Sequence, residues 1–589
     1  MCATRRAKIT PLGVMLVPLL LIVSACDSGP STVRVFPFPG ARVASPQTQI
    51  AFRGEPAREL GKIVVRGSRT GIHTGRIESD SDGHGASFIP AKPFASGELV
   101  TVSTRLRVQG ARGGTWRFSV ATPAGAVPSQ PLLPAARIGG DVLQFNSRPD
   151  LTPPAVEITK QAWDSAAGEI FVTPQQGPIQ NGAMIIAPDG ALIWFHPVAK
   201  GDMAADLRVQ QYRGKPVLTW WQGYSGAGIG QGEDVIDDTS YRTVAVVHAA
   251  NGLQADLHEF EITPSGTALI TSYYPVYWNA SSVRASAHQI VLDSVVQEID
   301  IKTGLLLFQW DSLDHVPLTD TYEPMPSGAG QPFDYFHVNS VEPDGRGNLI
   351  ISGRNTWAAY NVDLSGHTLW SLGGKHSSFR MGSGTRFAFQ HAVRTAPDDD
   401  QMITLFDNGA GPPRIHTQSR GLTLKLNQAS RKAELLRSNP HSPSLLASFE
   451  GSVQSLDSGD QVLGWGQQPY FSEYDPRGQI VFEGRFVDGN SSYRAYRLRW
   501  SATPSTLPAL AASTTAGTTT VYASWNGATT VGSWRVLAGA GRTAMHQVTT
   551  QPTLGFETQI AIPAAAFVAV QALDADGRVL STTATIAPS

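Results

Sequence analysis

The 589-residue chain has only two cysteines, Cys2 and Cys26, and both lie in its first 26 residues. The rest of the chain therefore has no disulfide and no thiol nucleophile. Charged residues make up only 16% and the formal net charge is −2, so the composition does not favour nucleic acid as a partner. Long amphipathic helical patterns are also absent, and the length exceeds one ordinary core. We therefore expect an all-β protein of several domains.

Familiar catalytic signatures are missing as well. The sequence contains no Gly-x-Ser-x-Gly elbow, no P-loop and no Cys-x-x-Cys pair. Gly228–Gly232 is rich in glycine but begins no helical pattern, so it does not predict a nucleotide cradle. We expect neither a cofactor nor a bound metal.

The N-terminus has the pattern of an exported lipoprotein. Three basic residues precede the apolar stretch Leu12–Val23, which is too short to span a bilayer comfortably. Val23–Cys26 then resembles a bacterial lipobox, in which the cysteine is acylated and becomes the mature N-terminus. We expect residues 1–25 to be a signal peptide and Cys26 to anchor the protein to the bacterial cell membrane, facing outside the cytoplasm. An ordinary secretory leader is the alternative.

Both flanks of the chain show short alternating strands. Examples are Leu99–Val102 in residues 31–125 and Val521–Trp525 in residues 508–589. This spacing predicts an N-terminal and a C-terminal β-sandwich of the immunoglobulin or fibronectin type. A Pro/Ala-rich linker, Pro123–Pro134, follows the first. Neither flank contains a cluster of catalytic residue types, so we expect both to be spacers or packing modules.

The middle of the chain, residues 140–502, contains a repeated hairpin with a polar or glycine-containing turn. Six copies occur: Met184–Trp194, Val244–Asp256, Ile299–Phe308, Tyr360–Trp370, Leu424–Leu436 and Glu473–Phe482. Six β units of about 50 to 65 residues predict a six-bladed β-propeller. The last unit lacks its second hairpin, and Glu169–Val172 is positioned to supply strands to it and close the ring.

Three of these units place a histidine at the start of an apparent inner strand. His258, His337 and His391 occupy the same point of the repeat. The first strand of each blade lines the central channel of a propeller, so we expect the three imidazoles to meet in one pocket. Arg354 lies at the far end of the hairpin that begins at His337, and its place in the pocket follows less directly.

Three histidines and one arginine suit a tetrahedral oxyanion such as a sulfuryl or phosphoryl group. Neutral imidazole is a nitrogen nucleophile, and protonated imidazole is a hydrogen-bond donor and a general acid. The guanidinium of arginine is permanently charged and donates paired hydrogen bonds to oxyanions. Two other interpretations stay open. In the first, the histidines are structural. In the second, they form a zinc site with three histidine ligands, although the positive charge of a nearby arginine would oppose binding of the cation.

The chain also resembles the arylsulfotransferase family of propellers, in the branch found in bacteria and fungi. The resemblance covers about residues 140 to 540 and includes Ser524–Thr529. The other matching stretches are Phe145–Leu151 with Pro153 and Pro154, Asp334–Val341, Ile350–Arg354, Leu369–Gly374, Phe389–His391, Leu405–Gly409 and Ser492–Arg497.

The resemblance implies an activity and a set of roles. Active members of the family move a sulfuryl group from a phenolic sulfate ester to another phenol, by way of a transiently sulfated histidine and without a nucleotide sulfate donor. Carried over, His391 is the nucleophile, and His258, His337 and Arg354 hold the sulfuryl oxygens, with one of these histidines protonating the leaving phenolate. The expected partners are a small aryl sulfate, a phenol and the membrane. A non-catalytic surface scaffold or anion-binding propeller is the alternative from another class.

Overall fold

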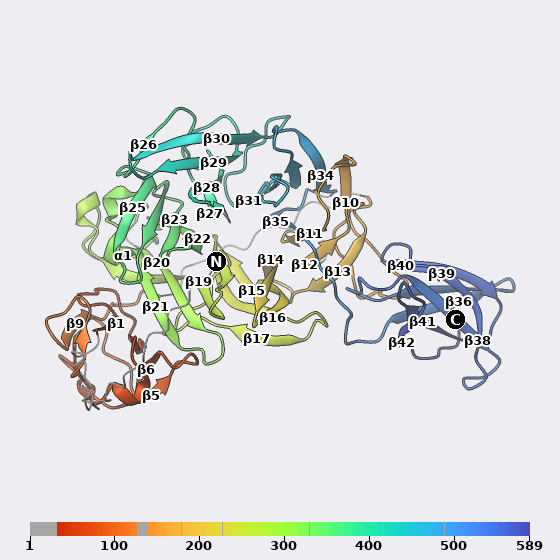
Figure 1. The fold of residues 1–589 in the computed structure, drawn as a ribbon, viewed down its shortest axis with the longest axis horizontal. Coiled ribbons are helices and arrows are strands. Elements are labelled where there is room, and N and C mark those ends of the chain that lie inside the picture. Colours follow the sequence, from red (N-terminus) through yellow and green to blue (C-terminus); the bar gives the residue numbers. More distant parts are fainter. Residues whose placement is uncertain are drawn as a thin grey trace, which may run out of the picture.

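The computed structural model of the chain describes most of its length (Figure 1). The described residues are 32–125, 139–177, 180–226, 228–328, 330–396, 399–487 and 489–589. The expected signal peptide, residues 1–25, and the expected lipid site at Cys26 lie outside them.

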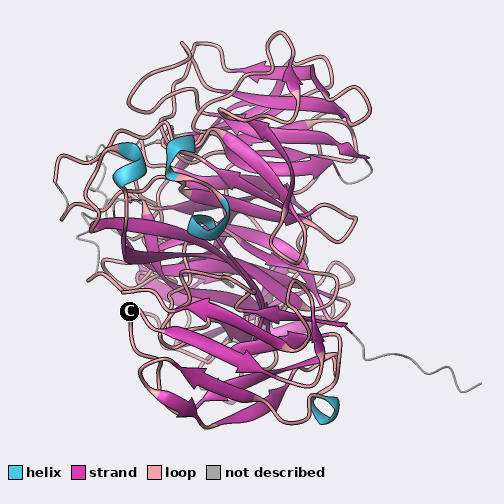
Figure 2. Ribbon diagram, turned by 90° about the vertical axis from the view of Figure 1, so that its left-hand side faces the viewer, coloured by secondary structure: helices cyan, strands magenta, loops and turns pink. Residues whose placement is uncertain are grey.

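The described chain is built almost entirely of strands, which confirms the all-β prediction. Figure 2 shows strands along the whole length of the molecule and only isolated helical turns. Glycines and other turn-forming residues punctuate short apolar runs, as β-hairpins require. The helical elements in the described residues are α1 (Ser312–His315), η1 (Ala57–Glu59), η2 (Ser281–Val283) and η3 (Leu318–Asp320). None of the helices in this part of the chain is long and apolar enough to cross a membrane.

The N-terminal segment forms two sheets around one apolar core. Their strand orders are β5-β6-β2-β1-β8 and β4-β3-β7-β9. Buried residues of both sheets, among them Phe52, Val65, Val102 and Trp116, contact one another. The strands are β1 (Thr32–Phe36), β2 (Ile50–Arg53), β3 (Val64–Gly67), β4 (Gly71–His73), β5 (Gly75–Ser79), β6 (Gly85–Pro90), β7 (Leu99–Ser103), β8 (Arg107–Val108) and β9 (Thr115–Ser119).

Six sheets of four or five strands follow in the described part of the middle segment. The first five in chain order are β13-β12-β11-β35, β14-β15-β16-β17, β18-β19-β20-β21, β22-β23-β24-β25 and β26-β30-β29-β28-β27, and the sixth is β10-β34-β33-β32-β31. Their strands are β10 (Val156–Gln161), β11 (Glu169–Pro174), β12 (Gly182–Ile186), β13 (Leu192–Pro197), β14 (Met203–Tyr212), β15 (Lys215–Gly226), β16 (Ile229–Asp237), β17 (Thr243–Val247), β18 (Phe260–Ile262), β19 (Thr267–Trp278), β20 (Gln289–Asp300), β21 (Leu306–Asp311), β22 (Val338–Pro343), β23 (Leu349–Gly353), β24 (Ala358–Val362), β25 (Thr368–Gly373), β26 (Arg380–Met381), β27 (His391–Ala396), β28 (Asp399–Asp407), β29 (Arg420–Asn427), β30 (Lys432–Pro440), β31 (Ser452–Ser455), β32 (Gln461–Gly464), β33 (Tyr470–Tyr474), β34 (Ile480–Phe486) and β35 (Ser492–Leu498).

The inner strands of these sheets lie around a common centre (Figure 1). Strand β14 contacts β35, β22 contacts β27, and β31 contacts both β27 and β35. Residues at the starts of these strands are therefore brought together although they are far apart in the sequence.

Segments from the two ends of the middle segment share sheets. Strand β11 pairs with β35, so that Ile170 lies opposite Arg497, and β10 pairs with β34. Glu169–Val172 thus joins the last strand of the middle segment, although in the sheet of β12 and β13. Pairing first and last segments removes edges that would otherwise be exposed.

One expected hairpin is wrong. The turn at Asn251–Gly252 has positive φ at both residues, but no strand follows it before β18. The N-terminal segment binds this stretch instead: Ser45 Oγ donates to the Asn251 carbonyl at 2.7 Å, and the Gln49 N–H donates to Asn251 Oδ1 at 3.0 Å. Contacts from a distant segment outweigh the local turn signal.

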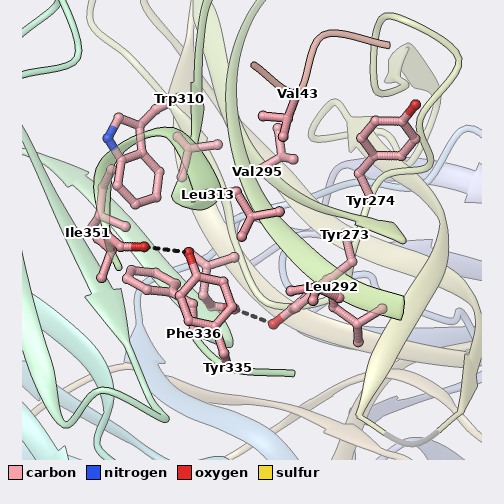
Figure 3. Close-up of a cluster of buried hydrophobic side chains, with 14 of the residues drawn as sticks. Val43, Tyr273, Tyr274, Leu292, Val295, Trp310, Leu313, Tyr335, Phe336 and Ile351 are labelled. Atoms are coloured by element: carbon pink, nitrogen blue, oxygen red, sulfur yellow. Dashed lines mark hydrogen bonds between the residues drawn. The ribbon is translucent and has the colours of Figure 1, made fainter. Parts of the chain in front are cut away.

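A large apolar core connects the third and fourth sheets to the N-terminal segment (Figure 3). Trp310, Tyr335 and Phe336 are fully buried in it, and Val43 comes from the N-terminal segment. Tyr273 belongs to the same core and donates its hydroxyl to the Val338 carbonyl at 2.7 Å. The core therefore fixes the start of β22, one residue after His337.

The C-terminal segment again has two sheets around one core. The strand orders are β36-β37-β40 and β39-β38-β41-β42. Val521, Trp534 and Val570 pack between them. The strands are β36 (Ala509–Thr515), β37 (Thr518–Ser524), β38 (Ser533–Gly539), β39 (His546–Pro552), β40 (Glu557–Pro563), β41 (Phe567–Leu573) and β42 (Val579–Thr582).

Candidate active site

A cavity of about 580 Å³ lies where inner strands of the middle segment begin. All four residues predicted from the sequence line it: His258, His337, His391 and Arg354. The three histidines are 3%, 8% and 1% exposed, so their chemistry is set by the cavity and not by bulk water. The rest of the wall is mixed apolar and polar and includes Met203, Leu257, Pro324, Pro326, Pro332, Phe333, Phe449, Tyr493, Glu323, Asp334, Asn355 and Glu450.

The backbone at the strand starts is irregular. His337 and Glu450 have φ values of 56° and 63°, and Ala392, after His391, has φ of 49°. The ladder between β22 and β23 shifts register near Val338, and that between β27 and β28 shifts after His391. Such bulges turn a side chain away from the regular alternation of a strand, and they are frequent beside functional sites.

His258 is held by Asp256. The Nδ1 atom of His258 lies 2.5 Å from Asp256 Oδ2, which also accepts the Thr271 hydroxyl at 3.1 Å, while Asp256 Oδ1 accepts the Gly230 N–H at 2.6 Å. Burial alone would raise the pKa of Asp256, but the charge interaction with His258 and these hydrogen bonds outweigh it, and the pKa lies below its usual value. Asp256 is therefore a carboxylate that orients the imidazole.

His337 has a carboxylate partner of its own. Its Nδ1 atom is hydrogen-bonded to Asp334, and its ring meets that of His258 edge-on with centroids 5.0 Å apart. Burial lowers the pKa of His337, the Asp334 carboxylate opposes this, and His258 and Arg354 lower it further. Two carboxylate-bound imidazoles thus share one side of the cavity.

His391 has a neutral partner, and this difference fixes its tautomer. Asn408 Nδ2 donates to the carbonyls of Ala447 and Glu450 at 3.0 and 2.9 Å, so the Asn408 Oδ1 atom is the acceptor that faces His391 Nδ1 at 2.7 Å. Nδ1 therefore carries the proton and Nε2 carries the lone pair. The N–H of Glu450 donates to Nε2 at 3.2 Å.

The charge state of His391 follows from its surroundings. Burial lowers its pKa well below the ordinary value, and the Arg354 guanidinium lowers it further, although the hydrogen bond to Asn408 opposes the shift. The imidazole is neutral at neutral pH. Of the three histidines, His391 is thus the one prepared to act as a nucleophile.

Arg354 lies directly beside His337. Its backbone N–H donates to the His337 carbonyl at 2.9 Å, because the antiparallel hairpin β22–β23 brings its first and last residues together. The guanidinium donates to Asn355 Oδ1 at 2.6 Å and to the Ser448 carbonyl at 3.0 Å, and it lies 4.9 Å from the centre of the Phe389 ring. These contacts orient a permanent positive charge in the wall of the cavity.

Beneath the histidines lies a buried cluster of charges around Glu259. Arg208, Arg394 and Arg494 donate to its carboxylate at 3.0, 2.6 and 3.2 Å. Arg494 also donates to the His258 carbonyl at 2.7 Å and to the Asn339 carbonyl at 3.1 Å. The cluster thus anchors the residue that carries the first imidazole.

Sequence reasoning missed several residues of the site. Asp256, Asp334 and Asn408 orient the three histidines, and Glu450 and Tyr493 line the cavity. A signal exists for the first two, since each carboxylate precedes its histidine by two or three residues. In the described part of the chain, no three His, Cys, Asp or Glu side chains are grouped so that they could hold a metal ion.

The comparisons with known proteins fit this all-β protein with a histidine-lined cavity. Residues 208–487, which contain all four predicted residues, match the family described as arylsulfotransferase (ASST). This match, which spans just under half of the chain, supports membership of the arylsulfotransferase family. No curated protein matches the chain.

Solved structures resemble the chain only weakly. A Bacteroides caccae protein of unknown function is 14% identical with a TM-score of 0.36, and the match covers 56% of this chain and 98% of that one. The periplasmic gluconolactonase PpgL of Pseudomonas aeruginosa is 12% identical with a TM-score of 0.31, and the match covers 72% and 96%. Such likeness does not bear on the function.

Proposed function

We propose that the protein transfers a sulfuryl group from a phenolic sulfate ester to a phenol through a sulfated His391. One observation carries the proposal: a neutral imidazole with a defined lone pair lies in the same buried cavity as two carboxylate-bound imidazoles and Arg354. Neither a nucleotide sulfate donor nor a metal is needed in this scheme.

The first half-reaction loads the histidine. Nε2 of His391 forms a bond to sulfur while the bond between sulfur and the phenolic oxygen breaks, and the departing phenolate takes a proton from the cavity wall. Arg354 donates hydrogen bonds to the sulfuryl oxygens, and His258 and His337 line the same pocket and hold the group in place. The second half-reaction reverses these steps with the acceptor phenol and restores neutral His391, which defines a ping-pong cycle.

The proposal includes an architecture and a location. The six central sheets are the blades of one propeller, residues 140–502, and the flanking pairs of sheets are β-sandwiches. The mature chain is held by lipid at Cys26 on the outer side of the bacterial cell membrane, where it meets small aryl sulfates and phenols. The pairing of β11 with β35 and the lipobox pattern support these two points.

A half-reaction tests the activity directly. Without acceptor, 4-nitrophenyl sulfate should release close to one equivalent of 4-nitrophenol per protein in a rapid burst, and mass spectrometry should locate one added SO₃ on His391. Added phenol should restart release and yield phenyl sulfate. Absence of both burst and turnover across a broad panel of donors would reject the proposal.

One contact favours the alternative of an anion-binding propeller without catalysis. The Glu450 N–H occupies the lone pair of His391 Nε2 at 3.2 Å, and this hydrogen bond must break before Nε2 attacks sulfur. A binding protein would hold inorganic sulfate or an aryl sulfate in the cavity and release it unchanged. Isothermal titration together with the burst assay separates the two functions.

Asn408→Asp should change the pH dependence of the reaction. A carboxylate beside Nδ1 would raise the pKa of His391, so the imidazole would keep a second proton to higher pH and lose its nucleophilic lone pair. We expect the acid limb of kcat/KM to move up by about one pH unit or more. The measurement is a pH–rate profile with 4-nitrophenyl sulfate.

Asn439→Asp is the matched control for this change. Asn439 is also buried, but it lies on β30, donates to Gln461 and does not line the cavity. Its variant should keep the wild-type acid limb. An unmoved limb in Asn408→Asp would show that His391 does not govern the profile.

A further inference from the structure

Glu450 is a buried acidic residue that lines the cavity. Its backbone N–H reaches His391 Nε2, and the residue is 8% exposed. Both of its carboxyl oxygens lie 2.8 Å from the Gln175 Nε2 atom, which in turn lies 3.0 Å from Ser491 Oγ. Glu450 thus lines the same cavity as the reacting nitrogen and contacts it through its backbone.

Glu450 differs from the other carboxyls of the cavity in its partners. Asp334 is bonded to His337, and Glu323 lies in the field of Arg354. Glu450, by contrast, forms no ion pair with a lysine, arginine or histidine of the described chain, and a neutral amide is its side-chain partner. Burial raises the pKa of Glu450 to about 7, and the Gln175 hydrogen bond only partly opposes this. Near neutral pH the group exists in both protonation states, as a group that alternates between acid and base requires.

We propose that Glu450 carries the proton of the reaction: its carboxyl protonates the departing phenolate, and its carboxylate then takes the proton from the incoming phenol. This proposal rests on the proposed sulfuryl transfer. In the first half-reaction, the O–H bond of Glu450 breaks as the phenolic O–H bond forms. In the second, the acceptor O–H bond breaks, its oxygen bonds to sulfur as the bond between sulfur and His391 Nε2 breaks, and the proton returns to Glu450. One proton leaves and one returns in each cycle.

The histidines are less suited to this task than Glu450. His258 and His337 are each hydrogen-bonded through Nδ1 to a carboxylate, which orients their rings. Burial lowers the pKa of His337, so this ring holds a second, transferable proton less readily than an ordinary imidazole. The other titratable and charged residues that line the same cavity are His258, His337, His391, Arg354, Asp334, Glu323 and Tyr493; burial raises the pKa of the Tyr493 hydroxyl well above its ordinary value.

The test compares two donors in Glu450→Gln. 4-Nitrophenolate leaves readily without a proton, whereas 4-methylphenolate needs one. Glu450→Gln should therefore form sulfated His391 from 4-nitrophenyl sulfate at close to the wild-type rate, but react with 4-methylphenyl sulfate about 10²- to 10⁴-fold more slowly. The contact between the backbone of residue 450 and His391 does not involve the side chain, so this substitution preserves it.

A second readout uses the wild-type protein alone. With 4-methylphenyl sulfate, the rate of the first half-reaction should fall as the pH rises through about 7, because the acid loses its proton. With 4-nitrophenyl sulfate this limb should be absent. A limb of equal size for both donors would overturn the proposal even if Glu450→Gln did not fold.

Glu342→Gln is the matched control. Burial also raises the pKa of Glu342 to about 7, but this carboxyl accepts the Thr395 N–H at 3.0 Å and does not line the cavity. Its variant should treat both donors as wild type does. Equal slowing of both donors in Glu450→Gln, or no slowing of either, would reject the role of Glu450. Failure of wild type to form sulfated His391 from either donor would instead reject the proposed function.

Discussion

His391→Ala should form no sulfated protein and should lose at least about 10⁴-fold in turnover, the scale of loss when a nucleophile is removed. The nitrogen that attacks sulfur is then absent, while His258, His337 and Arg354 still bind the ester. The measurements are the burst of 4-nitrophenol without acceptor and the mass of the protein. A burst of wild-type size in this variant would show that His391 is not the nucleophile.

Loss of the imidazole also removes a hydrogen-bond partner of Asn408, which costs about 1–3 kcal/mol of stability, so folding must be controlled. His441→Ala is the matched variant, because His441 is also buried but bonds to Glu483 and the Pro443 carbonyl and does not line the cavity. It should keep its activity. Free imidazole, added to His391→Ala, should restore part of the release of 4-nitrophenol and appear as imidazole N-sulfonate in solution.

Replacing Arg354 should also have a large effect on turnover. Arg354→Gln removes the one permanent positive charge among the four predicted residues, and we expect kcat to fall by about 10²- to 10³-fold. Arg354→Lys should lie between this variant and wild type, since it keeps the charge but loses the planar fork. Single-turnover rates with 4-nitrophenyl sulfate separate the loss in chemistry from any loss in binding.

Arg437→Lys is the control for Arg354. Arg437 is also partly buried and donates to backbone carbonyls, among them that of Tyr474 at 3.1 Å, but it does not line the cavity. We expect its variant to retain the wild-type single-turnover rate. If Arg354→Gln did the same, the guanidinium would have no part in stabilising the sulfuryl group.

The sequence predicts much of the framework because the repeat contains it. His258, His337 and His391 hold equivalent places in three similar hairpins, and equivalent places in successive sheets face one centre. The place of Arg354 was also accessible in principle, because the two ends of an antiparallel hairpin are always neighbours. The wrong hairpin at Asn251 shows the opposite case, in which contacts from a distant segment decide the conformation.

The site residues that the sequence analysis did not predict lie outside the positions that repeat from unit to unit. Asn408 follows β28, and Glu450 precedes Gly451, the position in the fifth unit that corresponds to the histidines. Gln175, which directly follows strand β11, reaches Glu450 from 275 residues away. No spacing rule connects such positions, since their contact depends on how far each bulged strand start turns its side chain.

Strand β35, which comes last in the central segment, supplies part of the cavity. Tyr493 forms part of the cavity wall, and its neighbour Arg494 holds the His258 carbonyl, so two contributions to the pocket come from the final strand of the central segment. A growing polypeptide that has not yet reached Ser492 lacks both. The cavity wall is therefore complete only once this last strand of the central segment has paired with β11.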